Sequence, residues 1–191
     1  MELETIPANQ YGIDPRTLKA MQYRIERQVP RTSNVATFHF TLRDATTRGY
    51  EPFRQHTEAS TGAGVYTEVN LQGKLVRINY SHSEYVFVHG DYFTELKESE
   101  EWPSVYVIDW VFTERAACNG AWWGNKHVEA GFAQMIKNLE TIQKFGKWDL
   151  NSEYDDYEER PDLNIRIVNS FNADDAKEGI KVAVNAYKRR N

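Results

Sequence analysis

Asp109 is the one polar residue in an otherwise apolar run, because the other seven residues of 105–112 are hydrophobic. Strand alternation puts Val107, Asp109 and Val111 on one face, and since both faces are apolar it predicts a central strand. A carboxylate among apolar neighbours must accept a hydrogen bond or keep its proton at a raised pKa. Asp109 is therefore a candidate catalytic group. The alternative, which we favour, is a structural strand residue with a satisfied hydrogen bond.

His39 lies in the tripeptide His-Phe-Thr, inside a stretch that alternates apolar and polar residues from 35 to 42. On a strand this spacing places the side chains of His39 and Thr41 on one face, opposite Phe38 and Phe40. Two-histidine phosphoesterases use two such tripeptides, whose imidazoles act as general acid and base. The sequence contains only one such tripeptide, so a catalytic role is the less favoured interpretation of His39.

Glu95 and Lys97 match the tail of a metal-dependent nuclease signature, in which two carboxylates hold a metal ion and the lysine steadies the attacking water. Asp91 is too close to Glu95 in the sequence to supply the first carboxylate, so Glu84 or an acid from residues 45–64 would have to supply it. The alternative is a solvated strand end. Four residues are the catalytic candidates of an enzyme hypothesis: His39, His82, Glu95 and Asp109.

Two aromatic stretches are the candidate binding surfaces. Trp122 and Trp123 lie between glycines, where one indole can be exposed for a partner or a base while the other enters the core. Residues 151–162 hold six acids and one arginine, and such a stretch can attract a basic partner or is a solvated loop. The candidate binding residues are Trp122, Trp123, Tyr154, Asp155, Asp156 and Tyr157.

Composition and motifs limit the classes of function. The net charge of -5 argues against a dedicated nucleic-acid binder. With a single cysteine, no secretory leader and no apolar run of membrane length, a cytoplasmic location without membrane insertion is expected. The sequence contains no paired Cys-x-x-Cys, no Gly-x-Gly-x-x-Gly loop and no His-Glu-x-x-His motif, so no cofactor and no metal site are predicted.

A single α+β domain over 1–191 is the expected architecture. A helix is predicted over 14–29 because Asp14 can cap it, Pro15 suits its first position, and Leu18, Met21 and Ile25 recur at helical spacing. Short gaps between apolar segments predict an antiparallel meander of five to six strands, with helices packed on the sheet. Its parts are a sheet over 35–115 with a long loop at 45–64, a helix at 127–145, and a strand plus helix at 163–190.

The favoured function is a small binding or interaction protein with a protein partner. Its narrower form is an acidic inhibitor or regulator of a nucleic-acid-handling complex. A metal-dependent nuclease or phosphodiesterase-like enzyme is the alternative. A second alternative is a nucleic-acid binder that uses the basic face of the 14–29 helix (Arg16, Lys19, Arg27) and the C-terminal Tyr-Lys-Arg-Arg.

Overall fold

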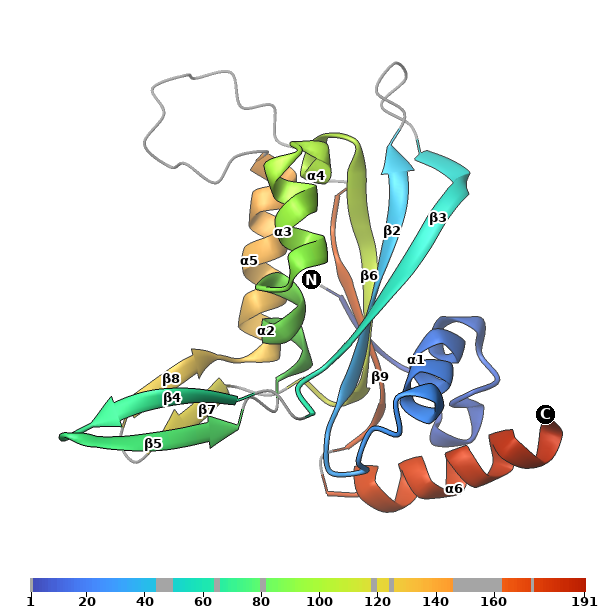
Figure 1. Cartoon of the computed structure of the whole chain (residues 1–191). Helices are drawn as coiled ribbons and strands as arrows, with labels where there is room; N and C mark the ends of the chain where they lie inside the picture. The colour runs from blue at the N-terminus through green and yellow to red at the C-terminus, as the bar shows by residue number, and fades with distance from the viewer. Residues whose placement is uncertain are drawn as a thin grey trace.

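A mixed five-stranded sheet is the centre of the protein (Figure 1). The computed structural model describes residues 2–43, 50–63, 66–79, 82–117, 120–123, 126–145, 163–172 and 174–191. The strand order is β1-β9-β6-β2-β3. These strands are β1 (Glu2–Thr5), β2 (Val35–Arg43), β3 (Tyr50–Thr61), β6 (Tyr106–Arg115) and β9 (Arg166–Phe171).

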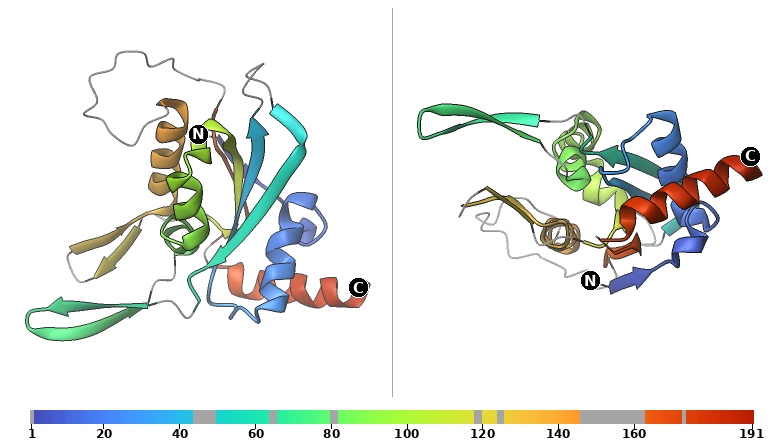
Figure 2. Two further views of the ribbon diagram at one scale, coloured as in Figure 1. Left: turned by 45° about the horizontal axis from the view of Figure 1, so that its top comes forward. Right: turned by 90° about the horizontal axis from the view of Figure 1, so that it is seen from below.

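Helices cover both faces of this sheet, and two further hairpins extend from it. Figure 1 shows α2, α3 and α5 on one face and α1 and α6 on the other. Figure 2 shows both hairpins projecting on the side of α2 and α5. The helices are α1 (Pro15–Glu26), α2 (Ser83–Val88), α3 (Asp91–Glu98), α4 (Glu101–Ser104), α5 (Phe132–Phe145) and α6 (Ala176–Arg190), with a short 3-10 turn, η1 (Ala8–Gln10). The hairpins are β4 (Tyr66–Leu71) with β5 (Lys74–Asn79), and β7 (Gly120–Trp123) with β8 (Lys126–Ala130).

The α+β class is confirmed, but the prediction of a purely antiparallel meander is wrong. β2 pairs antiparallel with β3 and β6, whereas β9 pairs parallel with both β6 and β1. The chain between β6 and β9 contains α5, and a crossover of this kind returns the next strand in the same direction. The described helices include none that is long and apolar enough to cross a bilayer.

Two predicted segments have a different structure. Residues 83–96, which lie inside the sheet predicted over 35–115, form α2 and most of α3, because short apolar runs do not distinguish a strand from a buried helix. The expected loop at 45–64 contains the twelve-residue strand β3, which pairs along β2. Pairing with a neighbour determined this strand, although its own sequence has no clear alternation.

Helix boundaries also differ from the expectation. The predicted helix at 14–29 is α1, whose cap is confirmed because the Asp14 side chain accepts a hydrogen bond from the Arg16 amide; α1 ends at Glu26. The predicted helix at 127–145 starts at Phe132, since β8 takes the residues before it. The strand and helix expected at 163–190 are β9 and α6.

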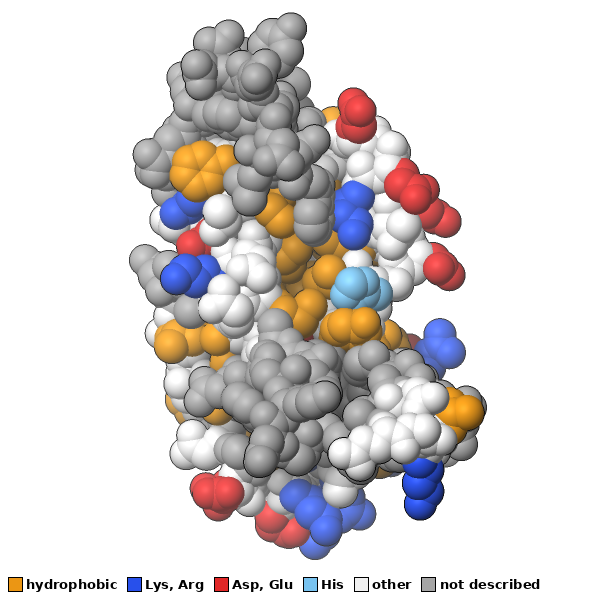
Figure 3. Space-filling view, turned by 90° about the vertical axis from the view of Figure 1, so that its left-hand side faces the viewer, with side chains coloured by type: hydrophobic (Ala, Val, Ile, Leu, Met, Phe, Trp, Pro, Cys, Tyr) orange, Lys and Arg blue, Asp and Glu red, His pale blue; other side chains and the backbone are white. Residues whose placement is uncertain are grey.

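The sheet separates two hydrophobic cores. Phe38 and Phe40 lie on the side of α2, α3 and α5, where the Phe38 ring stacks on Phe87 with 3.7 Å between centroids. Figure 3 shows hydrophobic side chains in a surface hollow on this side. On the opposite side Phe112 and Phe171 pack against α1, η1 and α6. A Cβ on Gly179 would lie 2.5 Å from the Phe171 ring, so the absence of a side chain lets α6 approach β9.

Candidate functional site

Asp109 lies at a β-bulge in the middle of the sheet. His39 is opposite Trp110 and Phe40 is opposite Ile108, so Asp109 is the extra residue of β6. The hydroxyl of Thr41 donates a hydrogen bond to its carboxylate. Burial raises the pKa of Asp109 to about 6, and the charge of Arg166 acts in the opposite direction. The carboxyl is thus half-buried and accepts a hydrogen bond.

His39 lies on the same face of the sheet, one strand away from Asp109. Its ring stacks on Trp110, with 4.6 Å between centroids and an interplanar angle of 7°. Its Nδ1 lies 2.9 Å from the Thr57 hydroxyl oxygen. Burial lowers the pKa of His39, because a charged imidazole is poorly solvated there. The polar side chains thus lie together on one face of the sheet: His39, Thr41, Thr57 and Asp109. α1 and α6 cover the same face near the other end of the sheet (Figure 1).

The other two catalytic candidates do not join this cluster. His82 precedes α2, and its Nδ1 lies 2.9 Å from a carboxylate oxygen of Glu84. Glu95 is exposed on α3, which packs against the opposite face of the sheet. The expected convergence depended on neighbouring strands, and the helical structure of residues 83–98 removes it. Among the described residues, no group of three or more His, Cys, Asp or Glu side chains could hold a metal ion.

The candidate binding residues cannot be placed in the same way. Trp122 and Trp123 belong to β7, but their side chains are not among the described ones. The four candidate binding residues of the 151–162 stretch also lie outside the described residues: Tyr154, Asp155, Asp156 and Tyr157.

A buried ion pair that the sequence patterns did not reveal joins α1 to β6. The Nη2 of Arg24 pairs with a carboxylate oxygen of Glu114, and the side chains of these residues are 3% and 0% exposed. Glu114 also accepts hydrogen bonds from the Tyr11 hydroxyl and the Val35 amide. The Nε of Arg24 also donates to Glu114, and the remaining donors of Nη1 and Nη2 reach the carbonyls of residues 29, 30 and 33. Every donor of the guanidinium therefore has a partner, and Arg24 has a structural role.

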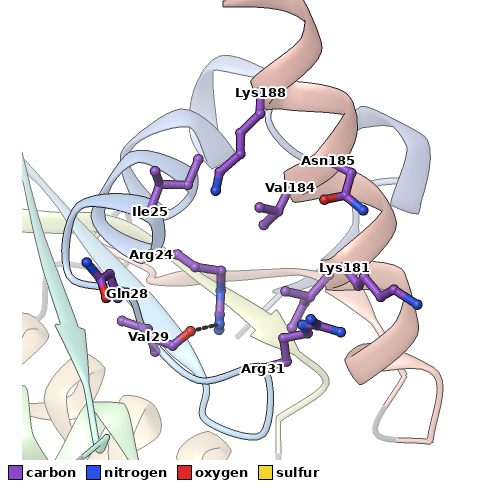
Figure 4. A pocket seen from close by; sticks show the side chains of 10 residues that line it. Arg24, Ile25, Gln28, Val29, Arg31, Lys181, Val184, Asn185 and Lys188 are labelled. Carbon is purple, nitrogen blue, oxygen red and sulfur yellow. Dashed lines mark hydrogen bonds between the residues drawn. The ribbon is translucent and has the colours of Figure 1, made fainter.

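Arg24 also lines a groove between α1 and α6, which we name the α1–α6 groove (Figure 4). Its volume is about 470 Å³. Figure 4 shows α1 and the segment after it on one side and α6 on the other. The apolar lining is Ile25, Val29, Ile180 and Val184; the polar lining is Arg24, Gln28, Arg31, Lys181, Asn185 and Lys188.

Three cations on the rim of the groove differ in their partners. Lys181 pairs with Glu178 at 3.0 Å, on its own helix. Arg31 and Lys188 are exposed, and no ion pair joins either of them to another described residue. Both residues line the groove.

Positive charge is concentrated in two segments that contain α1 and α6, whereas the rest of the chain is acidic. Residues 14–33 contain five basic and two acidic residues, and residues 174–191 contain five basic and three acidic ones. These two segments together carry +5, although the whole chain carries -5. The counts could be made from the sequence, but only the fold shows that the two segments lie side by side (Figure 2).

Asp109→Asn tests the role of the bulge carboxyl. Because the folded-state pKa is raised above the ordinary value, the carboxyl favours folding only while it is protonated. The wild type should therefore lose stability relative to the variant as the pH rises from about 4 to 6. At pH 7.5 we expect the variant to be more stable by about 1–2 kcal/mol, after allowance for partial exposure. Urea unfolding at pH 4 and pH 7.5 measures the difference, and equal differences at both values would contradict it.

The comparisons with known proteins add no family to these observations. No protein-family model matches the chain, and neither a curated protein nor a solved structure shows significant similarity to it.

Proposed function

We propose that this chain is a binding protein whose α1–α6 groove takes an acidic segment of a partner protein. The observation that carries the proposal is the combination of four aliphatic side chains with several cations in one groove between two helices. Ile25 and Val184 offer apolar surface in the groove, and Arg31 and Lys188 offer positive charge that no ion pair with another described residue neutralises. Peptide-binding grooves commonly combine apolar anchor sites with charges that set orientation and the rate of association.

An acidic protein segment suits this lining better than nucleic acid. Nucleic-acid affinity comes mainly from cations on phosphates and, for single strands, from aromatic side chains that stack on bases. None of the described residues that line the groove is aromatic, and its apolar lining residues are aliphatic. A peptide that carries leucine or isoleucine between glutamates and aspartates would bury its apolar side chains there and present carboxylates to the rim.

Fluorescence anisotropy with labelled probes tests the proposal. One probe is a 14-residue peptide of glutamate and leucine, with leucines at every third or fourth position. A second has glutamine in place of glutamate, and a third has serine in place of leucine. We expect the first to bind most tightly, because it alone has both features. A 20-nucleotide single-stranded DNA that binds more tightly, with a steep salt dependence, would overturn the proposal in favour of the nucleic-acid alternative.

Charge reversal in the groove gives the matched test. The double variant Arg31→Glu/Lys188→Glu should weaken binding of the first peptide about tenfold, because two attractions become repulsions. The control Lys74→Glu/Lys137→Glu makes the same charge change at exposed residues of β5 and α5. Equal losses in the two variants, or no binding by the wild type, would sink the proposal.

The enzyme hypothesis is a second candidate because His39 and Asp109 lie on one face of adjacent strands. Hydrolysis of bis(p-nitrophenyl) phosphate with Mg²⁺ or Mn²⁺ tests it. Turnover that Asp109→Asn and His39→Gln both abolish, while neither variant lowers the thermal midpoint, would favour an enzyme. The narrower role as a regulator of a nucleic-acid-handling complex stays a prediction.

A further inference from the structure

A second concavity lies between η1 and α6, and we name it the α6 pocket. Its volume of about 530 Å³ is in the range of sites that hold small molecules. None of the described residues that line it also lines the α1–α6 groove, so a ligand here is independent of the proposed function. The class of that ligand follows from the side chains that line the pocket.

Most of the lining is apolar. The rings of Tyr11 and Phe171 pack edge to face at its base, with 5.4 Å between centroids. Because the Tyr11 hydroxyl is already bonded to Glu114, its ring offers carbon atoms to the pocket. Val182, which is 61% exposed, and Ala186 line the side that α6 forms. A ligand that fills this space must therefore have an apolar body.

Charged side chains lie at the two ends of the α6 side. Asp175 and Glu178 are at the N-terminal end, and Glu178 pairs with Lys181 at 3.0 Å. Arg190 is at the C-terminal end, and no carboxylate among the described residues pairs with it. Its Nη2 donates a hydrogen bond to the Gly12 carbonyl at 3.4 Å, which leaves other donors of the guanidinium for a ligand. An anionic group is favoured at Arg190 and disfavoured beside the acids.

We propose that the α6 pocket binds a small amphiphilic carboxylate, such as a medium-chain fatty acid. Its carboxylate pairs with Arg190, since a guanidinium can hold a carboxylate through two parallel hydrogen bonds. Its acyl chain lies over the Tyr11 and Phe171 rings and removes the exposed Val182 side chain from water. Val182 and Arg190 are eight residues apart, which corresponds to about 12 Å along a helix. An acyl chain of about ten carbons has a similar length.

Isothermal titration calorimetry of the full chain with decanoate, below the concentration at which it forms micelles, tests the proposal. We expect one site per chain, and weaker binding of octanoate because two fewer methylene groups are buried. Decyltrimethylammonium has a chain of the same length with a cation as its head group, and it should not bind measurably. Since the net charge of -5 favours non-specific adsorption of the cation, preference for the anion indicates the pocket. No binding of decanoate, or equal binding of the two ten-carbon amphiphiles, would overturn the proposal.

Two pairs of variants locate the site. Arg190→Gln should weaken decanoate binding about fivefold, because it removes the cation and keeps a polar side chain. Arg189→Gln makes the same change at an exposed residue outside the pocket lining and should leave the affinity unchanged. Ala186→Phe should abolish binding by filling the pocket, whereas Lys177→Phe places the same ring on an exposed part of α6 outside it.

Circular dichroism confirms that the four variants keep their helices. Equal effects within either pair would show that decanoate binds elsewhere and would overturn the proposal.

Discussion

Replacing Glu114 with glutamine is expected to lower the free energy of unfolding by about 3–5 kcal/mol, the cost of leaving a buried charge without its partner. The glutamine keeps the shape of the side chain but leaves the Arg24 guanidinium as an uncompensated charge at 3% exposure. It also weakens the hydrogen bonds from the Tyr11 hydroxyl and the Val35 amide. Urea unfolding at pH 7 measures the loss. Glu178→Gln is the control, because Glu178 is exposed on α6 and should cost less than about 0.5 kcal/mol.

A double-mutant cycle shows whether charge pairing causes this loss. Arg24→Gln alone should also destabilise strongly, because it leaves the Glu114 carboxylate buried without a cation. The double variant Arg24→Gln/Glu114→Gln should lose less than the sum of the two singles, since no lone charge remains. Simple additivity would show that the two residues act separately and would contradict the assignment of a buried ion pair.

Gln143→Leu is expected to cost about 3 kcal/mol of stability and to loosen the end of β6. The buried Gln143 amide nitrogen donates to the carbonyls of Ile108 and Leu163, at 2.9 and 3.1 Å. Its amide oxygen accepts hydrogen bonds from the Ile108 amide at 2.7 Å and the Trp102 indole at 3.3 Å. Leucine would leave buried backbone groups without partners, each at a cost of about 1–3 kcal/mol before relaxation.

Hydrogen exchange gives a local measurement of the same substitution. The Ile108 amide precedes the part of β6 that pairs with β9, so the Gln143 side chain takes the place of a strand neighbour there. In Gln143→Leu, hydrogen exchange of the Ile108 amide should accelerate more than that of the Phe112 amide, which lies farther along the strand. Gln134→Leu on the exposed side of α5 is the control and should change neither the stability nor the exchange of the Ile108 amide. Unchanged protection of Ile108 would show that the glutamine is dispensable.

Local signals in the sequence were sufficient for several elements. The cap at Asp14, the alternation of β2 and the apolar stripe of α5 depend on residues close in the chain, and each predicted element is present. The prediction that residues 83–98 belong to the sheet was wrong, because their apolar residues fit a helix as well as a strand. Burial against the sheet favoured the helices. β3 was missed because pairing with β2, more than its own pattern, forms it.

Candidate sites were predicted less well, because each depends on contacts between distant residues. The sequence nominated Asp109 and His39 by residue type, but the bulge that displaces Asp109 requires the register between β2 and β6. It did not nominate Arg24 and Glu114, which are 90 positions apart and join only when α1 packs on β6. His82 and Glu95 were grouped with Asp109 on an assumed meander, and the helices separate them.

The sequence by itself determined the α+β class, the amphipathic segments and the excess of positive charge near residues 14–33 and 174–191. Propensity, periodicity and charge are local quantities, so they can be read without a structure. Only the tertiary structure decided that β9 runs parallel to β6, that Arg24 is neutralised by Glu114, and that α1 and α6 form one groove. These features arise from packing between segments far apart in the chain, where burial and electrostatics outweigh local preference.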